Sequence, residues 1–211
     1  MFGLVPDPPA RQKRRPHRRE QILAAAVQLF HEHGYHATGM DDIGAAMGIT
    51  GPGIYRHFRS KEEILETLVR ARGEAVLARV EELIAADRQP GETLDALARD
   101  FAEELARNPS VVVVSVYERR TLSEDTRVWL DRMERRNIDA WVSVLCRARP
   151  ELGPAEARVV VHATLMMGVA IANYNSGLDD EALVRLVHPM LVTALLGAPA
   201  PGARPRVRRG A

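Results

Sequence analysis

A run of short helical segments separated by glycines is the feature that most limits how this chain can fold. From Gln21 to His33, apolar residues recur at i, i+4, i+7 and i+8, which is the pattern of an amphipathic helix. Gly34 directly follows and is a typical helix end. The buried face of this first segment consists of Ile22, Ala26, Leu29 and Phe30.

The second segment is predicted to begin at a capping box. Thr38 is followed three residues later by Asp41, so the threonine can cap a helix whose third residue carries a carboxylate. The inward residues of this helix are expected to be Ile43 and Met47. Gly48 then ends it.

The third segment, Gly51–His57, follows Thr50, which can cap it, and tolerates Pro52 because that residue lies in the first turn. Gly51 and Gly53 remove side chains from the front of the helix, so its backbone can approach another surface closely. Because each glycine costs roughly 1 kcal/mol relative to alanine, neighbouring residues must hold the helix in place. Ile54 and Phe58 can do this. Two short helices joined at a glycine and braced by a first helix form a helix-turn-helix unit.

Helix signals continue through the rest of the chain. Ala, Leu, Arg and Glu dominate, and β-branched runs between turn signals are scarce. Capping residues at Ser60, Ser123 and Asp179 mark three further starts. The predicted fold class is therefore all-α with about nine helices, the later ones over residues 60–87, 91–107, 110–120, 123–147, 155–176 and 179–196.

The charge is unevenly distributed. Residues 1–61 carry nine Lys and Arg against five Asp and Glu, residues 62–196 carry sixteen against twenty-three, and residues 197–211 add four arginines. A basic N-terminal third on an acidic body predicts an anionic partner at one end. The single cysteine, Cys146, excludes an intramolecular disulfide framework and fits a reducing cytoplasm. The longest apolar run, residues 159–172, is shorter than the ~18–20 residues that span a bilayer, so we expect a soluble protein without a membrane partner.

The segment QILAAAVQLFHEHGYHATGMDDIGAAMGITGPGIYRHFRSKEEIL resembles the TetR family of bacterial transcriptional repressors. The resemblance rests on LF-x-x-x-GY-x-x-T, then D-I-x-x-x-x-G, then Y-x-H-F-x-x-K-E, and the rest of the chain matches only in architecture. It implies a helix-turn-helix DNA-binding domain over residues 19–61 and a ligand-binding and dimerisation domain over residues 62–196. A disordered basic arm, residues 1–18, and a disordered basic tail, residues 197–211, would flank them. The same architecture favours a helix for the valine-rich residues 110–120.

The resemblance also implies a DNA-binding surface in which the third helix enters the major groove and a dimer reads two half-sites. Groove-facing positions are Thr50, Gly51, Pro52, Gly53 and Tyr55, and phosphate contacts are Thr38, Tyr55, His57 and Lys61. Arg56 can meet phosphate or base. Because two glycines flank Pro52, few donors remain for base recognition, so specificity should depend on Pro52, Tyr55, Arg56 and DNA shape.

Two alternatives stay open at this surface. Tyr55 and His57 can instead pack the small domain. The basic residues near the N-terminus can lie along DNA or form a solvated tail; they are Arg11, Lys13, Arg14, Arg15, Arg18 and Arg19.

The second half of the chain is expected to form the dimer and the effector site. The helix over residues 155–176 is apolar around most of its circumference, so a second subunit most simply covers its outer side. With the final helix it resembles the family's four-helix dimer interface. The alternative is that both are ordinary core helices. The predicted interface residues are Val160, Met167, Ile171, Leu183, Val187, Met190 and Leu191.

The effector pocket implied by the resemblance is lined by Phe101, Tyr117, Trp129, Met133, Asn137, Trp141, Met166 and Asn173. Because these residues carry hardly any charge, we expect a largely apolar effector oriented by a polar group such as Asn137. Arg132, Arg135 and Arg136 could anchor an acidic headgroup at the pocket mouth. The alternative is that the same residues simply form core.

No catalytic constellation is present in the sequence. It lacks a nucleophile elbow, a phosphate-binding glycine loop and an HExxH motif, and His31, His33 and His36 do not share a helix face for a metal. We therefore predict no enzyme activity, no metal and no cofactor. The predicted function is a cytoplasmic, dimeric, ligand-responsive repressor that binds double-stranded DNA. The alternatives are an architectural DNA-binding protein without effector or a helical enzyme.

Overall fold

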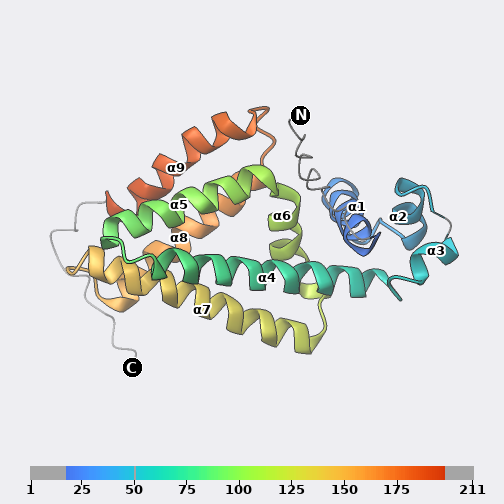
Figure 1. Ribbon diagram of the computed structural model, residues 1–211, viewed down its shortest axis with the longest axis horizontal. Helices are drawn as coiled ribbons and strands as arrows, with labels where there is room; N and C mark the ends of the chain where they lie inside the picture. The colour runs from blue at the N-terminus through green and yellow to red at the C-terminus, as the bar shows by residue number, and fades with distance from the viewer. Residues whose placement is uncertain (1–17, 50, 198–211) are drawn as a thin grey trace, which may run out of the picture.

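The computed structural model describes residues 18–49 and 51–197, and every regular element in these ranges is helical, as predicted. These described residues form nine α-helices and a short 3₁₀ helix. Figure 1 labels the α-helices. The basic arm and the tail, residues 1–17 and 198–211, lie outside the described residues. The elements are α1 (Arg18–His33), α2 (Met40–Ala46), α3 (Gly51–Tyr55), α4 (Lys61–Ala85), α5 (Pro90–Arg107), α6 (Pro109–Tyr117), η1 (Glu118–Thr121), α7 (Glu124–Ala148), α8 (Pro154–Ala172) and α9 (Asp180–Leu196).

Three predicted helix starts are confirmed by their capping hydrogen bonds. The backbone N–H of Glu63 donates to Ser60 Oγ at 3.4 Å, and that of Thr126 donates to Ser123 Oγ at the same distance. The N–H of Ala182 donates to Asp179 Oδ1 at 2.7 Å. Each bond satisfies a helix N–H that has no partner within the helix.

The predicted start of α2 is wrong by one residue. Gly39, not Thr38, is the N-cap, and its backbone N–H donates to Asp42 Oδ2 at 2.7 Å. The Thr38 side chain instead turns into the protein, where its hydroxyl donates to the carbonyl oxygen of Gly34 at 3.0 Å. Thr38 therefore closes the end of α1 and does not open α2.

The valine-rich segment after Asn108 is a helix, as predicted, over residues 109–117. β-branched residues disfavour helices only weakly, and burial of Val112, Val113 and Val114 outweighs that preference here. The chain then tightens into η1 before Ser123 starts α7.

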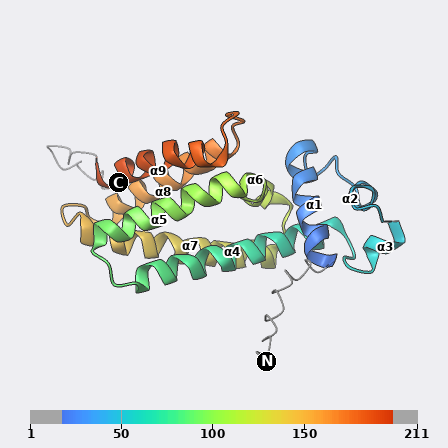
Figure 2. The same ribbon diagram turned by 45° about the horizontal axis from the view of Figure 1, so that its top comes forward.

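The molecule is elongated, with α1, α2 and α3 at one end and the long helix α4 leading from them along the rest (Figures 1 and 2). Two hydrophobic clusters form the core. The first joins α1 to α3 with the beginning of α4, and it also takes in Val114, Leu122 and Leu130 from α6, the following loop and α7. The first turns of α4 thus pack with the N-terminal helices through Ile64, Leu65 and Val69.

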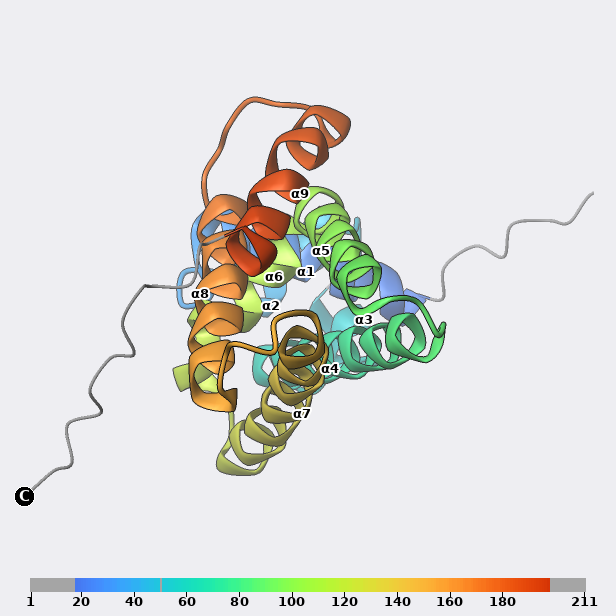
Figure 3. The same cartoon turned by 90° about the vertical axis from the view of Figure 1, so that its left-hand side faces the viewer.

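The second cluster fills the space between α5, α7, α8 and α9, which Figure 3 shows nearly end on. Helices α8 and α5 approach closely at Gly168. A Cβ on Gly168 would lie 2.5 Å from Phe101 Cε1 and 2.9 Å from Leu105 Cδ1, so a larger residue at this crossing would have to displace these side chains.

Helix α8 is the one described helix that is long and apolar enough to cross a bilayer when judged by length and composition alone. It has 19 residues, more than the apolar run counted in the sequence, and an 18-residue window with a mean hydropathy of 1.4. Only 39% of that window is buried within the chain. One such helix is weak evidence for a membrane span. The apolar side of α8 that is not buried within the chain therefore has to be explained in another way.

Candidate functional site

The third helix, α3, lies at the tip of the molecule, beyond α1 and α2 (Figures 1 and 2). Pro52 and Arg56 are exposed, and Tyr55 is 53% exposed despite its size. His57 is half-buried. Thr50 lies outside the described residues, and Gly51 begins the helix. The tip therefore presents a proline, a tyrosine and an arginine to solvent.

Two buried side chains hold this five-residue helix. Ile54 and Phe58 are almost completely buried in the N-terminal cluster, as their spacing predicted. Arg19 covers Phe58, with its guanidinium carbon 3.9 Å from the ring centroid, and its Nη1 donates to the carbonyl oxygen of His57. Arg19 also pairs with Glu63 at 3.4 Å. This arginine, predicted to belong to the arm, thus packs against the end of α3.

Lys61 ties the first turn of α4 to the link between α1 and α2. Its Nζ donates to the carbonyl oxygens of Tyr35 at 2.9 Å, Thr38 at 3.0 Å and His36 at 3.4 Å. The same ammonium lies 4.4 Å from the centroid of the Tyr35 ring. Lys61 thus has a structural role that the sequence did not predict.

Thr38 is 2% exposed, and its hydroxyl bonds to its own chain. A phosphate contact from this side chain therefore needs rearrangement, whereas the exposed Tyr55 and Arg56 are already accessible.

Acidic residues at the start of α4 are held in their ionised form. The backbone N–H of Arg59 donates to Glu63 Oε2 at 2.8 Å, which lowers the pKa of that carboxyl, and Arg19 lowers it further. A hydrogen bond from Ser60 is the main cause that lowers the pKa of Glu62. These carboxylates are fixed beside the helix N-terminus, where the helix dipole favours negative charge.

The predicted pocket residues divide into three groups. Trp141, Asn137, Phe101 and Met133 are buried or partly buried in the C-terminal half. Trp129 packs instead against the N-terminal cluster, with the Arg70 guanidinium 5.0 Å from its ring centroid.

The other three pocket predictions are not supported by burial. Tyr117 is 57% exposed at the end of α6, Met166 is 41% exposed on α8, and Asn173 is an exposed C-cap. Their helical spacing did not reveal which side of each helix faces the core.

Sequence reasoning missed Arg72. This arginine lies on the buried side of α4, three residues after Val69 and eight before Val80, and its Nε is sealed from solvent without a hydrogen-bond partner. Burial lowers the pKa of the Arg72 guanidinium, and Glu104 and Glu134 partly oppose that effect. The signal was available, because Arg72 interrupts the apolar stripe of α4.

The predicted dimer face needs a correction. Val187 and Leu191 are 1% and 0% exposed, so they belong to the core of their own chain. Val160, Met167, Ile171 and Leu183 are partly buried against that core, and only Met190, at 43%, is well exposed. The inner and outer stripes of an apolar helix look alike in sequence, which is why the prediction included Val187 and Leu191; the interface itself stays a prediction.

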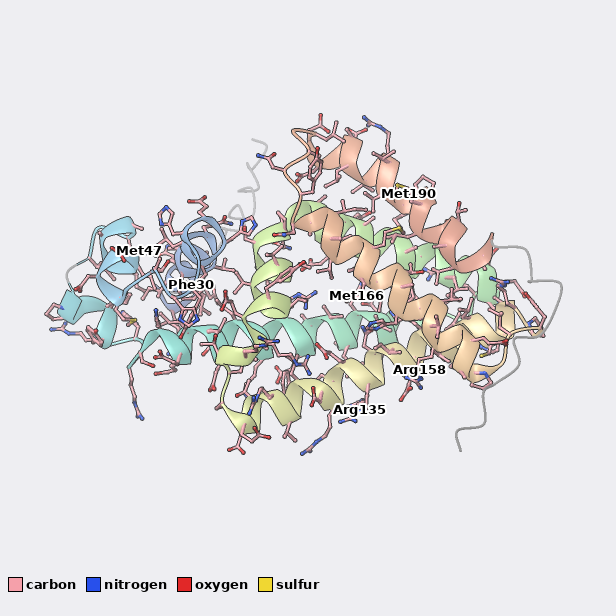
Figure 4. All side chains as sticks on the ribbon, turned by 180° about the vertical axis from the view of Figure 1, so that it is seen from behind. Phe30, Met47, Arg135, Arg158, Met166 and Met190 are labelled. Carbon is pink, nitrogen blue, oxygen red and sulfur yellow. The ribbon has the colours of Figure 1, made fainter. Side chains whose placement is uncertain are left out.

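The exposed apolar side chains of α8 and α9 include Met190 from the predicted set and three neighbours of predicted residues. They are Val159 and Met166 on α8 and Leu186 and Met190 on α9, exposed by 70%, 41%, 55% and 43%. In Figure 4, α8 and α9 cross the rear of the molecule with Met166 and Met190 on them. An open depression of about 680 Å³ adjoins this face, lined by Ile138, Pro154, Ala155, Arg158, Val159, His162 and Ala163.

Comparison with known proteins agrees with this arrangement. The family model described as bacterial regulatory proteins of the tetR family matches residues 22–68, that is, α1 to the start of α4. The transcriptional repressor KstR2 of Mycobacterium tuberculosis is 30% identical over 129 residues, which are 61% of this chain and 64% of the relative. The match thus spans slightly less than two thirds of that relative's length.

Solved structures extend the similarity of fold over most of the chain. The structure of KstR2, called a ketosteroid transcriptional regulator, has a TM-score of 0.76 and 23% identity, covering 88% of this chain and 98% of that one. AibR, solved with isovaleryl coenzyme A and operator DNA, has a TM-score of 0.71 and 24% identity, covering 85% and 98%. Residues 22–68 of this chain thus match the N-terminal unit of the tetR family of bacterial regulatory proteins, and most of the chain shares its all-helical fold with the solved structures.

Proposed function

We propose that this protein is a dimeric transcriptional repressor that binds operator DNA through α3 and leaves it when a small molecule binds within the C-terminal helices. The observation that carries the proposal is the tip of the molecule. There Pro52 and Tyr55 of α3, and Arg56 directly after it, are exposed to solvent, while Ile54 and Phe58 anchor the helix in the core. A rigid helix with accessible aromatic and cationic groups suits the major groove.

A second subunit is part of the proposal. One tip reads only a half-site, and the exposed apolar side chains of α8 and α9 form a face that water would cover in a monomer. Joining two copies through this face buries those side chains and provides two reading heads. It also accounts for the apolar side of α8 without a membrane.

Ligand control has a physical route through the structure. Helix α6 contacts α1, where Ser110 Oγ donates to Gln28 Oε1 at 3.0 Å and lies 3.1 Å from His31 Nδ1. Helix α4 belongs to both hydrophobic clusters. A ligand that prefers one arrangement of α4 and α6 would therefore shift the separation of the two reading heads. The structure of AibR with an acyl thioester and operator DNA supports such a role for this fold.

The test measures the affinity of the purified protein for DNA fragments from the region upstream of its own gene. Fluorescence anisotropy at several salt concentrations gives the dissociation constant. We expect Arg56→Ala and Tyr55→Ala each to weaken binding by about fivefold to 150-fold, since good base or phosphate contacts contribute about 1–3 kcal/mol. The matched control is Arg147→Ala, an exposed arginine at the opposite end of α7. Equal affinity of all four proteins for the bound fragment would reject α3 as the reading element.

A further inference from the structure

Among the buried side-chain polar atoms of the described residues that make no hydrogen bond, three lie on the neighbouring helices α4 and α7. They are Arg72 Nε on α4 and, on α7, Asn137 Oδ1 and Trp141 Nε1. An unpaired polar atom in a protein interior loses its hydration without compensation, so each such atom calls for an explanation. Two of the three are donors, and the third is an acceptor.

Helices α4, α5 and α7 pack on one another, and Gly73, the residue after Arg72, faces α7 at Met133: a Cβ on Gly73 would lie 4.0 Å from Met133 Cβ. Glu134, Asn137 and Trp141 follow at i, i+3 and i+7 along α7, so they share one face of that helix. Glu134 on α7 and Glu104 on α5 are the two charges that act on Arg72. Arg72 therefore lies level with Glu134, at one end of a stripe that reaches Trp141.

The two glutamates near Arg72 are occupied by other donors. Glu134 Oε2 accepts a hydrogen bond from Arg119 Nη1 at 2.6 Å, and Glu104 Oε2 accepts one from Asn108 Nδ2 at 3.0 Å. None of the ion pairs within 4 Å in the described ranges includes Arg72. Since an arginine stays protonated even when buried, Arg72 carries a charge without a close counter-ion.

We infer that the region between α4, α5 and α7 binds an elongated organic acid, whose carboxylate pairs with Arg72 and whose second polar group lies between Asn137 and Trp141. This inference rests on the proposed function, because it names the chemical class of the effector. A carboxylate accepts two parallel hydrogen bonds from a guanidinium and supplies the missing charge.

The second polar group has to donate to Asn137 Oδ1 and accept from Trp141 Nε1. A hydroxyl or an amide does both. Asn137 and Trp141 follow Glu134 by three and seven residues, which correspond to about 5 and 10 Å at 1.5 Å per residue. The ligand is therefore an apolar skeleton with an acid at one end and a hydroxyl or amide about 5–10 Å away. The partly buried Phe101 and Met133 supply apolar surface for the skeleton.

The experiment uses two hydroxy acids of suitable length, 10-hydroxydecanoate and 4′-hydroxybiphenyl-4-carboxylate, each compared with its methyl ester. Binding is measured by thermal shift and isothermal calorimetry on the full-length protein. We expect at least one acid to bind and to raise the melting temperature, and its ester to bind at least about tenfold more weakly, because the ester has no charge for Arg72. Failure of both acids to bind would overturn the inference.

Variants of the three residues complete the test. Arg72→Met is expected to fold, to melt no lower than the wild type without ligand, and to lose the preference for acid over ester. Arg72→Lys should keep part of that preference. Trp141→Phe should weaken both acid and ester, since it removes the donor at the other end. Arg79→Met is the control on the same helix, because Arg79 is exposed and already paired with Asp100 and Glu82. A large fall in melting temperature for ligand-free Arg72→Met, or failure of that variant to fold, would show Arg72 to be a structural ion-pair partner and reject the inference.

DNA binding is measured separately with the same upstream fragments. A protein that binds DNA but neither acid keeps the proposed function and loses the inference. A protein that binds an acid through Arg72 but binds no DNA fragment keeps the inference as a binding site and loses the proposed function.

Discussion

Single residues in the N-terminal unit serve structure and surface chemistry at once. Tyr55 and Arg56 are exposed at the tip. The family resemblance implies that Lys61 contacts phosphate, but its ammonium donates hydrogen bonds to three carbonyl oxygens of its own chain. Carbonyls at the end of a helix and in the following link lack partners within the chain's regular hydrogen bonding. A lysine from another helix satisfies several of them together.

Replacing Lys61 should therefore affect stability as well as DNA binding. We expect Lys61→Met to reduce the free energy of unfolding by about 1–3 kcal/mol, because hydrogen bonds from a charged group are lost together. Urea denaturation followed by circular dichroism measures the change. Arg59→Met, an exposed neighbour, is the control. If both variants unfold at the wild-type urea concentration, the contacts of Lys61 contribute nothing to stability.

The ionisation of Glu63 makes the stability of the folded protein depend on pH. Its pKa in the folded protein is lowered, first by the backbone N–H of Arg59 and then by Arg19. A carboxyl with a lowered folded pKa stabilises the protein above its unfolded pKa, near 4.3, and that stabilisation is lost as the pH falls through the folded pKa. Glu63→Gln should hence lower stability at pH 7 and unfold with a shallower dependence on pH below about 4.5. Parallel pH profiles of the two proteins, measured by thermal melting, would contradict this assignment.

Helices in this molecule are positioned by small residues at their crossings. Gly168 lets α8 approach α5 so closely that a Cβ would lie 2.5 Å from Phe101 Cε1, and Gly73 lets α4 approach the Trp129 ring on α7. Both glycines are inside helices, where the residue itself is unfavourable. Close packing of the helices compensates for that cost.

Filling the α5–α8 crossing should separate the two helices. We expect Gly168→Ala to destabilise the protein by about 1–3 kcal/mol, which is typical of overpacking in a core. Gly91→Ala is the matched control, because no atom lies within 4 Å of the added Cβ, and it should be neutral or slightly stabilising. Combining Gly168→Ala with Phe101→Leu should recover part of the loss. If the Gly168→Ala protein is as stable as the wild type, the side chains at the α5–α8 crossing can move without loss of stability.

At the scale of the whole molecule, the uncovered apolar face of α8 and α9 is the main departure from a self-sufficient domain. Val159, Met166, Leu186 and Met190 lie on the outer side of these helices, beside an open depression. Apolar side chains gathered on one face of a water-soluble protein are typical of an interface. The dimer proposed above covers this face.

Charge placed on that face should prevent the assembly. We expect Met190→Glu and Met166→Glu to shift the protein from dimer to monomer in sedimentation equilibrium, because a carboxylate buried without a partner is unfavourable. Both side chains are exposed in the single chain, so the monomers should keep the helical content of the wild type. Val128→Glu on α7, 39% exposed, is the control and should remain dimeric. Dimers of wild-type affinity for both methionine variants would place the interface elsewhere.

The sequence by itself determined the helical class, most helix starts and the helix-turn-helix unit. These depend on interactions between residues close in the chain: Ser60, Ser123 and Asp179 each cap the helix that follows, and Ile54 and Phe58 share a face by spacing alone. Local chemistry of this kind can be read directly from the order of residues.

Only the tertiary structure decided which side of each helix is inside and which polar groups meet. Val187 and Leu191 turned out to be core, while their neighbours Leu186 and Met190 are exposed. Helices α8 and α9 are apolar on both sides, so periodicity cannot tell the two faces apart. The same holds for Lys61, which donates to carbonyl oxygens about 25 residues away, and for Arg72, whose Nε has no hydrogen-bond partner and whose charge is acted on by carboxylates of α5 and α7. Contacts between distant segments arise only when the helices pack.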